Sequence, residues 1–189
     1  MKDMNIMVVG VGGQGTLLTS RIIGKTAMNN GLDVKMSEVH GMAQRGGSVV
    51  TFVRFGDKVY EPVVEEGCAD VIISFEKLEA LRYSHFLKKD GVLIVNDCSI
   101  SPMSVLTGMA EYPKNIFDTL SKNHKCFTID ALSVAKELGN PKVVNTVVLG
   151  FSAKHLGFNL EDWISVIENT VPPKTVQINK DAFMAGYNN

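Results

Sequence analysis

The spacing of apolar residues changes twice within the first forty positions of the chain. Residues 5–10, NIMVVG, form the short apolar run of a buried strand, and a glycine-rich turn follows it. Apolar residues at helical spacing then run from Leu17 to Ala27, and Gly31 is expected to end that helix. Residues 33–37, DVKMS, have the character of a second strand. This order predicts a βαβ unit, a motif of parallel sheets that are covered by helices.

The next segment has the composition of an antiparallel hairpin. Residues 48–62, SVVTFVRFGDKVYEP, place β-branched and aromatic residues on both sides of Gly56 and Asp57. A turn at these two residues would join two strands at an edge of the sheet, and Pro62 would end the second strand.

Strands and helices alternate again in the middle of the chain. Continuous apolar runs predict buried parallel strands at residues 70–75, 91–97 and 125–131, and helical spacing predicts helices at residues 76–89 and 132–139. Residues 97–115 contain two prolines and a glycine, which favours a long irregular connection.

From Pro141 onward the apolar residues follow helical periodicity. Helices are expected at residues 142–158, 160–171 and 179–187. The last of them would pack either on its own sheet or on a partner protein. Together the patterns predict an α/β, Rossmann-like fold, with a mostly parallel sheet, helices on both faces, an edge β-hairpin and a helical C-terminal region. A chain of 189 residues suits a single domain, residues 1–189, with a substantial core.

Charge and hydropathy argue against a nucleic-acid-binding protein and against a membrane protein. With 19 basic and 20 acidic side chains the net charge is -1, which lacks the positive footprint of a nucleic-acid-binding protein. No window reaches the roughly 18 apolar residues of a membrane span, and the first residues do not resemble a signal peptide. We therefore expect a cytoplasmic protein that binds neither nucleic acid nor membrane.

The cysteines do not form a pattern suited to metal binding. Cys68, Cys98 and Cys126 are widely spaced, whereas zinc and iron-sulfur sites use thiolates clustered at short intervals. We expect three reduced structural thiols, and no metal or cluster bound by this chain.

The glycine-rich turn has the spacing G-x-G-x-x-G. Gly10, Gly12 and Gly15 match it, in the required place between a strand and a helix. The N-terminus of the helix offers N–H groups and partial positive charge to an anion. Glu38 follows Gly15 by 23 positions, a spacing compatible with an acid that holds a ribose. Dinucleotide binding and a tight turn without a cofactor both remain open, and the bulky Gln14 within the turn argues against the first.

A second glycine-bordered loop lies within residues 37–50, SEVHGMAQRGGSVV. It carries the imidazole of His40, the amide of Gln44 and the guanidinium of Arg45, followed by Gly46. In an open α/β sheet this loop would emerge beside the glycine turn, at the strand ends where such folds bind ligands. The alternative is a wide structural turn in which Arg45 pairs with Glu38 or Glu76. No nucleophile stands at usable spacing from His40, so we assign no catalytic residue.

The two loops together resemble those of the gamma-type modules of 2-oxoacid:ferredoxin oxidoreductases. The similarity includes GGQG, residues 12–15, and SEVHGMAQRGGSV in the second loop. It also includes NTVVLG and NKDAFMAGY near the C-terminus, so that it covers most of the chain. Within this family the second loop most resembles that of the beta subunits of indolepyruvate:ferredoxin oxidoreductases. Pyruvate-type gamma subunits resemble the chain at GGQG but tend to differ in the second loop.

The resemblance implies an oxidative decarboxylation: an arylpyruvate, coenzyme A and oxidised ferredoxin give an aryl-acetyl-CoA, carbon dioxide and reduced ferredoxin. Such complexes use thiamine diphosphate, magnesium and [4Fe-4S] clusters. The resemblance implies that an alpha subunit carries these groups and that this chain alone binds none of them. It also implies that ferredoxin binds to the assembled complex.

By the same resemblance, the turn residues Gly10, Gly12, Gly13, Gln14 and Gly15 would face coenzyme A or another anion. Residues of the second strand and loop would line the cleft or the subunit junction: Glu38, His40, Gln44, Arg45 and Gly46. Alternative functions are a stand-alone NAD(P)-dependent dehydrogenase, a pyruvate-type gamma subunit and a structural interaction module.

Overall fold

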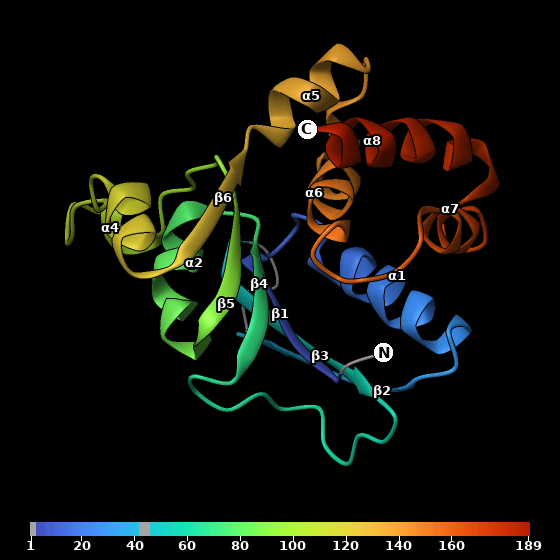
Figure 1. Cartoon of the computed structure of the whole chain (residues 1–189). Coiled ribbons are helices and arrows are strands. Elements are labelled where there is room, and N and C mark those ends of the chain that lie inside the picture. Colours follow the sequence, from blue (N-terminus) through green and yellow to red (C-terminus); the bar gives the residue numbers. More distant parts are fainter. Residues whose placement is uncertain (1–2, 42–45) are drawn as a thin grey trace.

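A six-stranded sheet organises the computed structural model, which describes residues 3–41 and 46–189 (Figure 1). The strands are β1 (Met4–Val11), β2 (Asp33–His40), β3 (Ser48–Gly56), β4 (Ala69–Ser74), β5 (Leu87–Asn96) and β6 (Lys125–Ile129). Their order in the sheet is β2-β3-β1-β4-β5-β6. The pairs β1–β4, β4–β5 and β5–β6 are parallel, and β3 runs antiparallel to both of its neighbours. The expected mostly parallel sheet is confirmed.

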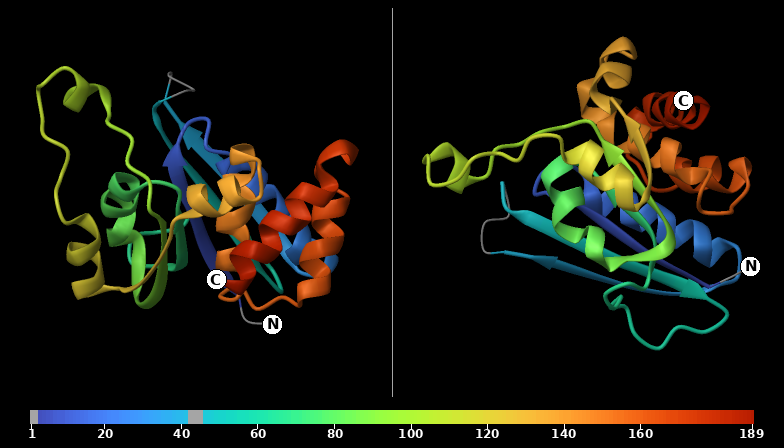
Figure 2. Two further views of the ribbon diagram at one scale, coloured as in Figure 1. Left: turned by 90° about the horizontal axis from the view of Figure 1, so that it is seen from above. Right: turned by 60° about the vertical axis from the view of Figure 1, so that its left-hand side comes forward.

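Helices cover both faces of this sheet, as the sequence predicts (Figures 1 and 2). One face carries α1 (Thr16–Asn29), α6 (Val144–Ala153), α7 (Leu160–Glu168) and α8 (Val176–Asn188). The other carries α2 (Lys77–Tyr83) and α4 (Ile116–Asn123). The remaining helices are α3 (Met103–Leu106), α5 (Ala131–Glu137) and the single 3₁₀ turns η1 (Ser84–Phe86), η2 (Pro141–Val143) and η3 (Pro173–Thr175).

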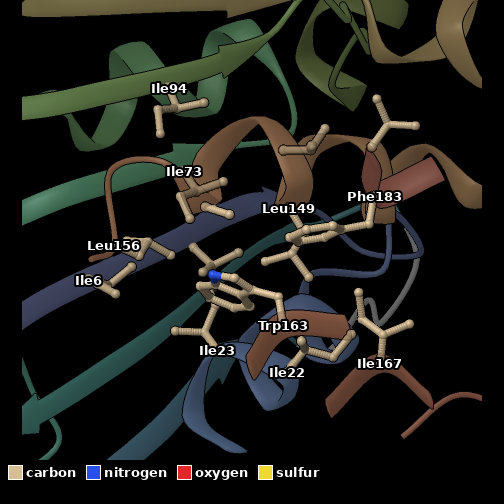
Figure 3. Packing of buried hydrophobic residues seen from close by; sticks show 14 of the residues in the cluster. Ile6, Ile22, Ile23, Ile73, Ile94, Leu149, Leu156, Trp163, Ile167 and Phe183 are labelled. Carbon is tan, nitrogen blue, oxygen red and sulfur yellow. The ribbon is translucent and has the colours of Figure 1, made fainter. Parts of the chain in front are cut away.

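The apolar run of β1 supplies both hydrophobic cores because successive side chains of a strand point to opposite faces. Ile6 and Val8 belong to the core beneath α1 and α6–α8, and Met7 and Val9 to the core beneath α2 and α4. Around the fully buried Trp163, the first core gathers side chains from both the sheet and the helices (Figure 3). A continuous apolar strand is therefore the signature of a sheet that is buried on both sides.

The predicted βαβ unit is wrong in one respect. Strands β1 and β2 run in the same direction, but β3 lies between them and pairs with both. The composition of the strands gives the reason, because β3, SVVTFVRFG, is more apolar than β2, DVKMSEVH. The more apolar strand takes the interior position, and β2 becomes the edge.

The hairpin predicted at residues 48–62 is also wrong, because β3 ends at Gly56 and residues 57–68 form an irregular connection. Both edges of β3 are already paired, so a strand returning from Gly56 has no free edge beside it. The edge hairpin of the fold is instead β2–β3, in continuous register from Asp33 opposite Gly56 to His40 opposite Val49.

Two other boundaries differ from the sequence analysis. The helix predicted at residues 76–89 ends at Tyr83, and β5 begins earlier than expected, at Leu87. The long connection predicted at residues 97–115 is present and also contains the short α3, which was not predicted; Figure 2 shows it standing away from the body of the molecule.

The C-terminal helix packs on its own chain. Ala182 and Phe183 are fully buried in the first core, and α8 crosses α6 at unusually close range. A Cβ atom on Gly186 would lie 2.0 Å from the carbonyl oxygen of Val147, and one on Gly150 would lie 2.0 Å from that of Phe183. The two glycines therefore set the separation of the helices.

This contact predicts that Gly186→Ala lowers the free energy of unfolding by about 1–3 kcal/mol, because overpacking at a backbone contact forces the helices apart. Urea denaturation measures the change. Gly41→Ala is the matched control, since nothing lies within 4 Å of a Cβ at that position. Equal stability of the two variants would contradict the role of the close crossing.

Candidate functional site

The turn between β1 and α1 requires its glycines. Gly13 and Gly15 have φ angles of +103° and +86°, in the left-handed region that favours glycine. Gly10 lacks a Cβ for a different reason, because one there would lie 2.9–3.1 Å from atoms of Gln14, Phe75 and Thr16. The sequence motif thus marks a tightly packed turn that leads directly into the first turn of α1.

Gln14 closes this turn with its own side chain. Its Oε1 accepts a hydrogen bond of 2.7 Å from the backbone N–H of Val11, and its Nε2 donates one of 3.0 Å to the carbonyl oxygen of Phe75. Nε2 also lies 3.9 Å from Sγ of Cys98. The amide therefore joins the ends of β1, β4 and β5, so that the bulky residue within the motif has a local structural role.

The two glycine-bordered loops meet, as the sequence predicts. The backbone N–H of Gly12 donates to the carbonyl oxygen of Gly47 at 2.8 Å, and that of Gly46 donates to the carbonyl oxygen of Gly12 at 3.4 Å. Because β3 lies antiparallel to β1, the start of β3 stands beside the end of β1. Gln44 and Arg45 lie outside the described residues.

A cavity of about 400 Å³ opens between the two loops. Its lining comes from the turn, the start of α1, and strands β2 and β3: Gly12, Gly13, Gly15, Thr16, Leu17, Glu38, His40 and Val49. Glu38 and His40 are two positions apart on β2 and therefore face the same side of the sheet. Oε2 of Glu38 accepts a long hydrogen bond of 3.4 Å from the hydroxyl of Thr51.

Three residues that line the cavity were not predicted from the sequence: Thr16, Leu17 and Val49. The first two directly follow the glycine motif and form the first turn of α1. Their signal was present in the sequence, because a ligand bound at a helix N-terminus contacts the first turn of that helix. Val49 follows from the antiparallel position of β3, which was not predicted.

The electrostatics of the cavity combine a helix terminus with one carboxylate. Helix α1 has no acidic residue in its first turn and no side-chain cap, so its first N–H groups are available to an anion. Glu38 stands across the cavity and is exposed. Such a pair suits a ligand with a phosphate at one end and hydroxyl groups at the other. The lining offers groups for binding rather than a nucleophile and its base.

The cysteines are free thiols, as predicted. Burial raises the pKa of Cys98, with the carboxylate of Glu76 adding to the effect, and burial raises the pKa of Cys126 to about 11. Both thiols are therefore protonated at neutral pH. Within residues 3–41 and 46–189, no group of three or more His, Cys, Asp and Glu side chains is arranged to hold a metal ion. No helix in this part of the chain has the length and apolar character to cross a bilayer.

Residues 5–189 match the family model described as pyruvate ferredoxin/flavodoxin oxidoreductase. The chain belongs to this family. The resemblance seen in the two loops is thereby confirmed, and it extends over nearly the whole fold.

Individual proteins that resemble the chain are also subunits of 2-oxoacid oxidoreductases. The chain is 45% identical to the indolepyruvate oxidoreductase subunit IorB of Pyrococcus horikoshii, over 98% of this chain and 95% of that protein. It is 31% identical to the pyruvate synthase subunit PorC of Methanothermobacter marburgensis, over 94% and 92% of the two chains. The crystal structure of the gamma subunit of a keto/oxoacid ferredoxin oxidoreductase from Geobacter sulfurreducens superimposes with a TM-score of 0.73 at 26% identity, covering 98% of this chain and 96% of that one.

The hydrogen bonds of Gln14 predict that replacing its amide lowers the free energy of unfolding. Gln14→Met keeps the length of the side chain but leaves the Val11 N–H and the Phe75 carbonyl without their partner, so we expect a loss of about 1–3 kcal/mol in the free energy of unfolding. Urea denaturation measures it. Gln177→Met is the control, because that amide is bonded to Asp181 on the exposed face of α8. Equal effects at the two positions would refute the assignment.

Proposed function

We propose that this chain is the beta subunit of an indolepyruvate, or more broadly arylpyruvate, ferredoxin oxidoreductase. The complex oxidatively decarboxylates an arylpyruvate with coenzyme A, giving an aryl-acetyl-CoA, carbon dioxide and reduced ferredoxin. The near-full-length identity of 45% to an indolepyruvate oxidoreductase subunit, against 31% to a pyruvate synthase subunit, supports the arylpyruvate branch over a pyruvate-type gamma subunit.

The redox and carbanion chemistry belongs to a partner in this proposal. Thiamine diphosphate, magnesium and [4Fe-4S] clusters are held by the alpha subunit, and ferredoxin docks on the complex. The three widely separated thiols of this chain do not suit cluster ligation, which requires thiolates close together. The chain acts as a single cytoplasmic module, residues 1–189, that completes the active assembly.

The cavity between the two loops is the proposed site for coenzyme A. Its phosphates would lie against the turn at Gly13 and Gly15 and the N-terminus of α1, and Glu38 would accept hydrogen bonds from ribose hydroxyls. His40 would stand at the mouth of the cavity. The observation that carries this proposal is the direct hydrogen bonding of the two loops around one cavity at a helix N-terminus.

Gln44 and Arg45 complete the proposal as contacts to the ligand or to the alpha subunit. An arginine fork matches phosphate and carboxylate alike, and the loop that carries it begins at His40 on the rim of the cavity.

One observation favours a second candidate, a stand-alone NAD(P)-dependent dehydrogenase, because Glu38 does line the cavity beside the glycine turn. The sheet order weakens this candidate. A dinucleotide fold places the ribose-binding acid on the strand next to β1, whereas β3 separates β2 from β1 here. Glu38 is therefore one strand farther from the turn than the dinucleotide motif expects.

Reconstitution distinguishes the subunit from both a dehydrogenase and a structural module. We expect the purified chain to be colourless and inactive, and to restore CoA-dependent reduction of ferredoxin by indolepyruvate when it is added to an alpha subunit prepared alone. Anaerobic spectrophotometry of ferredoxin measures the rate. Full activity without this chain would leave it only a scaffold, and reduction of NAD by the chain alone would establish the dehydrogenase.

Leu17 allows a test of the anion site that spares the fold. Leu17→Glu places a negative charge in the first turn of α1, where it favours the helix but repels a polyanion in the cavity. In the assembled complex we expect the KM for coenzyme A to rise by about tenfold, equivalent to about 1.4 kcal/mol, with little change in stability. Leu17→Gln, neutral and of similar size, is the matched control. A KM equal in both variants would place coenzyme A elsewhere.

A further inference from the structure

A second cavity, of about 310 Å³, lies on the other side of the glycine turn. Gly13 lines both cavities, but the remaining walls differ. They come from the turn, the end of β5, and the segment from α5 to α6: Gln14, Asn96, Cys98, Leu132, Pro141, Lys142, Val144 and Asn145. The cavity lies at the carboxyl end of the sheet, where the connections from β1 and β4 lead to opposite sides of it. Open α/β sheets bind ligands at such a point.

Asn145 is the polar residue of this cavity with the most hydrogen-bonding capacity left for a ligand. The residue is only 9% exposed, and its side chain lies so close to Gly15 that a Cβ there would be 2.9 Å from Nδ2. Its amide lines the cavity and forms no hydrogen bond with the part of the chain that the structure describes. The neighbouring amides of Gln14 and Asn96 are, by contrast, bonded to the backbone. The amide of Asn145 therefore keeps its hydrogen-bonding capacity for a molecule in the cavity.

Lys142 is the one charged side chain among the described residues that line this cavity. Lys142 lines it and, among the described residues, has no carboxylate within ion-pair distance. The carboxylates close enough to raise the pKa of Cys98 are bonded elsewhere: Glu76 to Tyr112, Asp97 to Lys77 at 2.7 Å and Asp130 to Ser133. The raised pKa of Cys98 keeps that thiol neutral. Lys142 is therefore an exposed cation at the cavity wall, and no carboxylate stands among the described lining residues.

The remaining walls are apolar. Leu132, Pro141 and Val144 form them, and Leu132 is a large hydrophobic residue left 42% exposed. The volume is at the lower end of the range of about 300–1,000 Å³ for small-molecule pockets. A single ammonium and one amide, without an arginine among the described lining residues, match a singly charged carboxylate better than a phosphate.

We propose that this cavity is a separate binding site for an aryl carboxylate. Its carboxylate accepts hydrogen bonds from Asn145 Nδ2 and Lys142 Nζ, and its aromatic body packs on the apolar wall. The assignment of an aryl acid rests on the proposed function, whose substrate and hydrolysed product share this chemistry. The existence of a carboxylate site rests on Asn145 and Lys142 alone.

The test is a titration of the isotopically labelled full chain, followed by NMR, with phenylacetate, phenylpyruvate and inorganic phosphate in separate arms. We expect saturable shifts of the Asn145 side-chain amide and the Leu132 methyl groups with either aryl acid, and none with phosphate at the same concentration. Asn145→Asp, nearly identical in size but negatively charged, should weaken binding by at least about tenfold. The matched control is Asn159→Asp at the exposed start of α7.

Absence of saturable binding, a response to phosphate alone, or unchanged affinity in Asn145→Asp would each overturn the proposal. If Asn145→Asp does not fold, as judged by circular dichroism, the exposed Lys142→Glu replaces it and should show the same loss. Leu17→Glu separates this proposal from the coenzyme A site, because it should leave aryl-acid binding unchanged. If the aryl-carboxylate site is refuted, the expected effect of Leu17→Glu on the KM for coenzyme A still stands. If that effect is absent, aryl-acid binding at Asn145 can still be observed.

Discussion

The antiparallel position of β3 between β1 and β2 determines the geometry of both loops. An antiparallel neighbour begins where β1 ends, so the backbone of Gly46 and Gly47 comes within hydrogen-bonding distance of Gly12. With β2 directly beside β1, as in a simple βαβ unit, the two loops would still emerge at one edge of the sheet, but the start of β3 would not be placed to bond with Gly12. The cavity beside α1 thus depends on strand order more than on any single side chain.

The glycine turn serves as a wall shared by two cavities. Its inner contacts explain why it holds its shape: Gln14 joins it to the ends of β4 and β5, and Asn145 packs against Gly15. Its outer surface, at Gly13, is exposed and carries no side chain. A backbone that is fixed on one side and bare on the other allows a ligand to approach the N-terminus of α1 closely.

Sequence patterns predicted the mostly parallel sheet, the helices on both faces and the meeting of the two loops, because buried strands and glycine turns have strong local signals. They did not predict that β3 would lie between β1 and β2. That choice depends on which strand buries more apolar surface, a comparison between β2 and β3 that neither segment reveals alone. The second cavity was equally hidden, since Asn145 and Lys142 belong to a helical segment more than a hundred residues from the glycine motif. Only the fold brings them together.

The connection between β5 and α4 is fastened at its base to one buried carboxylate. Glu76, 1% exposed, caps α2 and also accepts hydrogen bonds from the backbone of Ile100 and from the hydroxyl of Tyr112. The two ends of the connection are therefore held at one point, while Met103, Leu106 and Met109 between them remain largely exposed. The segment between Ile100 and Tyr112 can therefore change in length and composition without moving the sheet. The position of the sheet thus depends on the anchors at Ile100 and Tyr112 and not on the exposed tip between them.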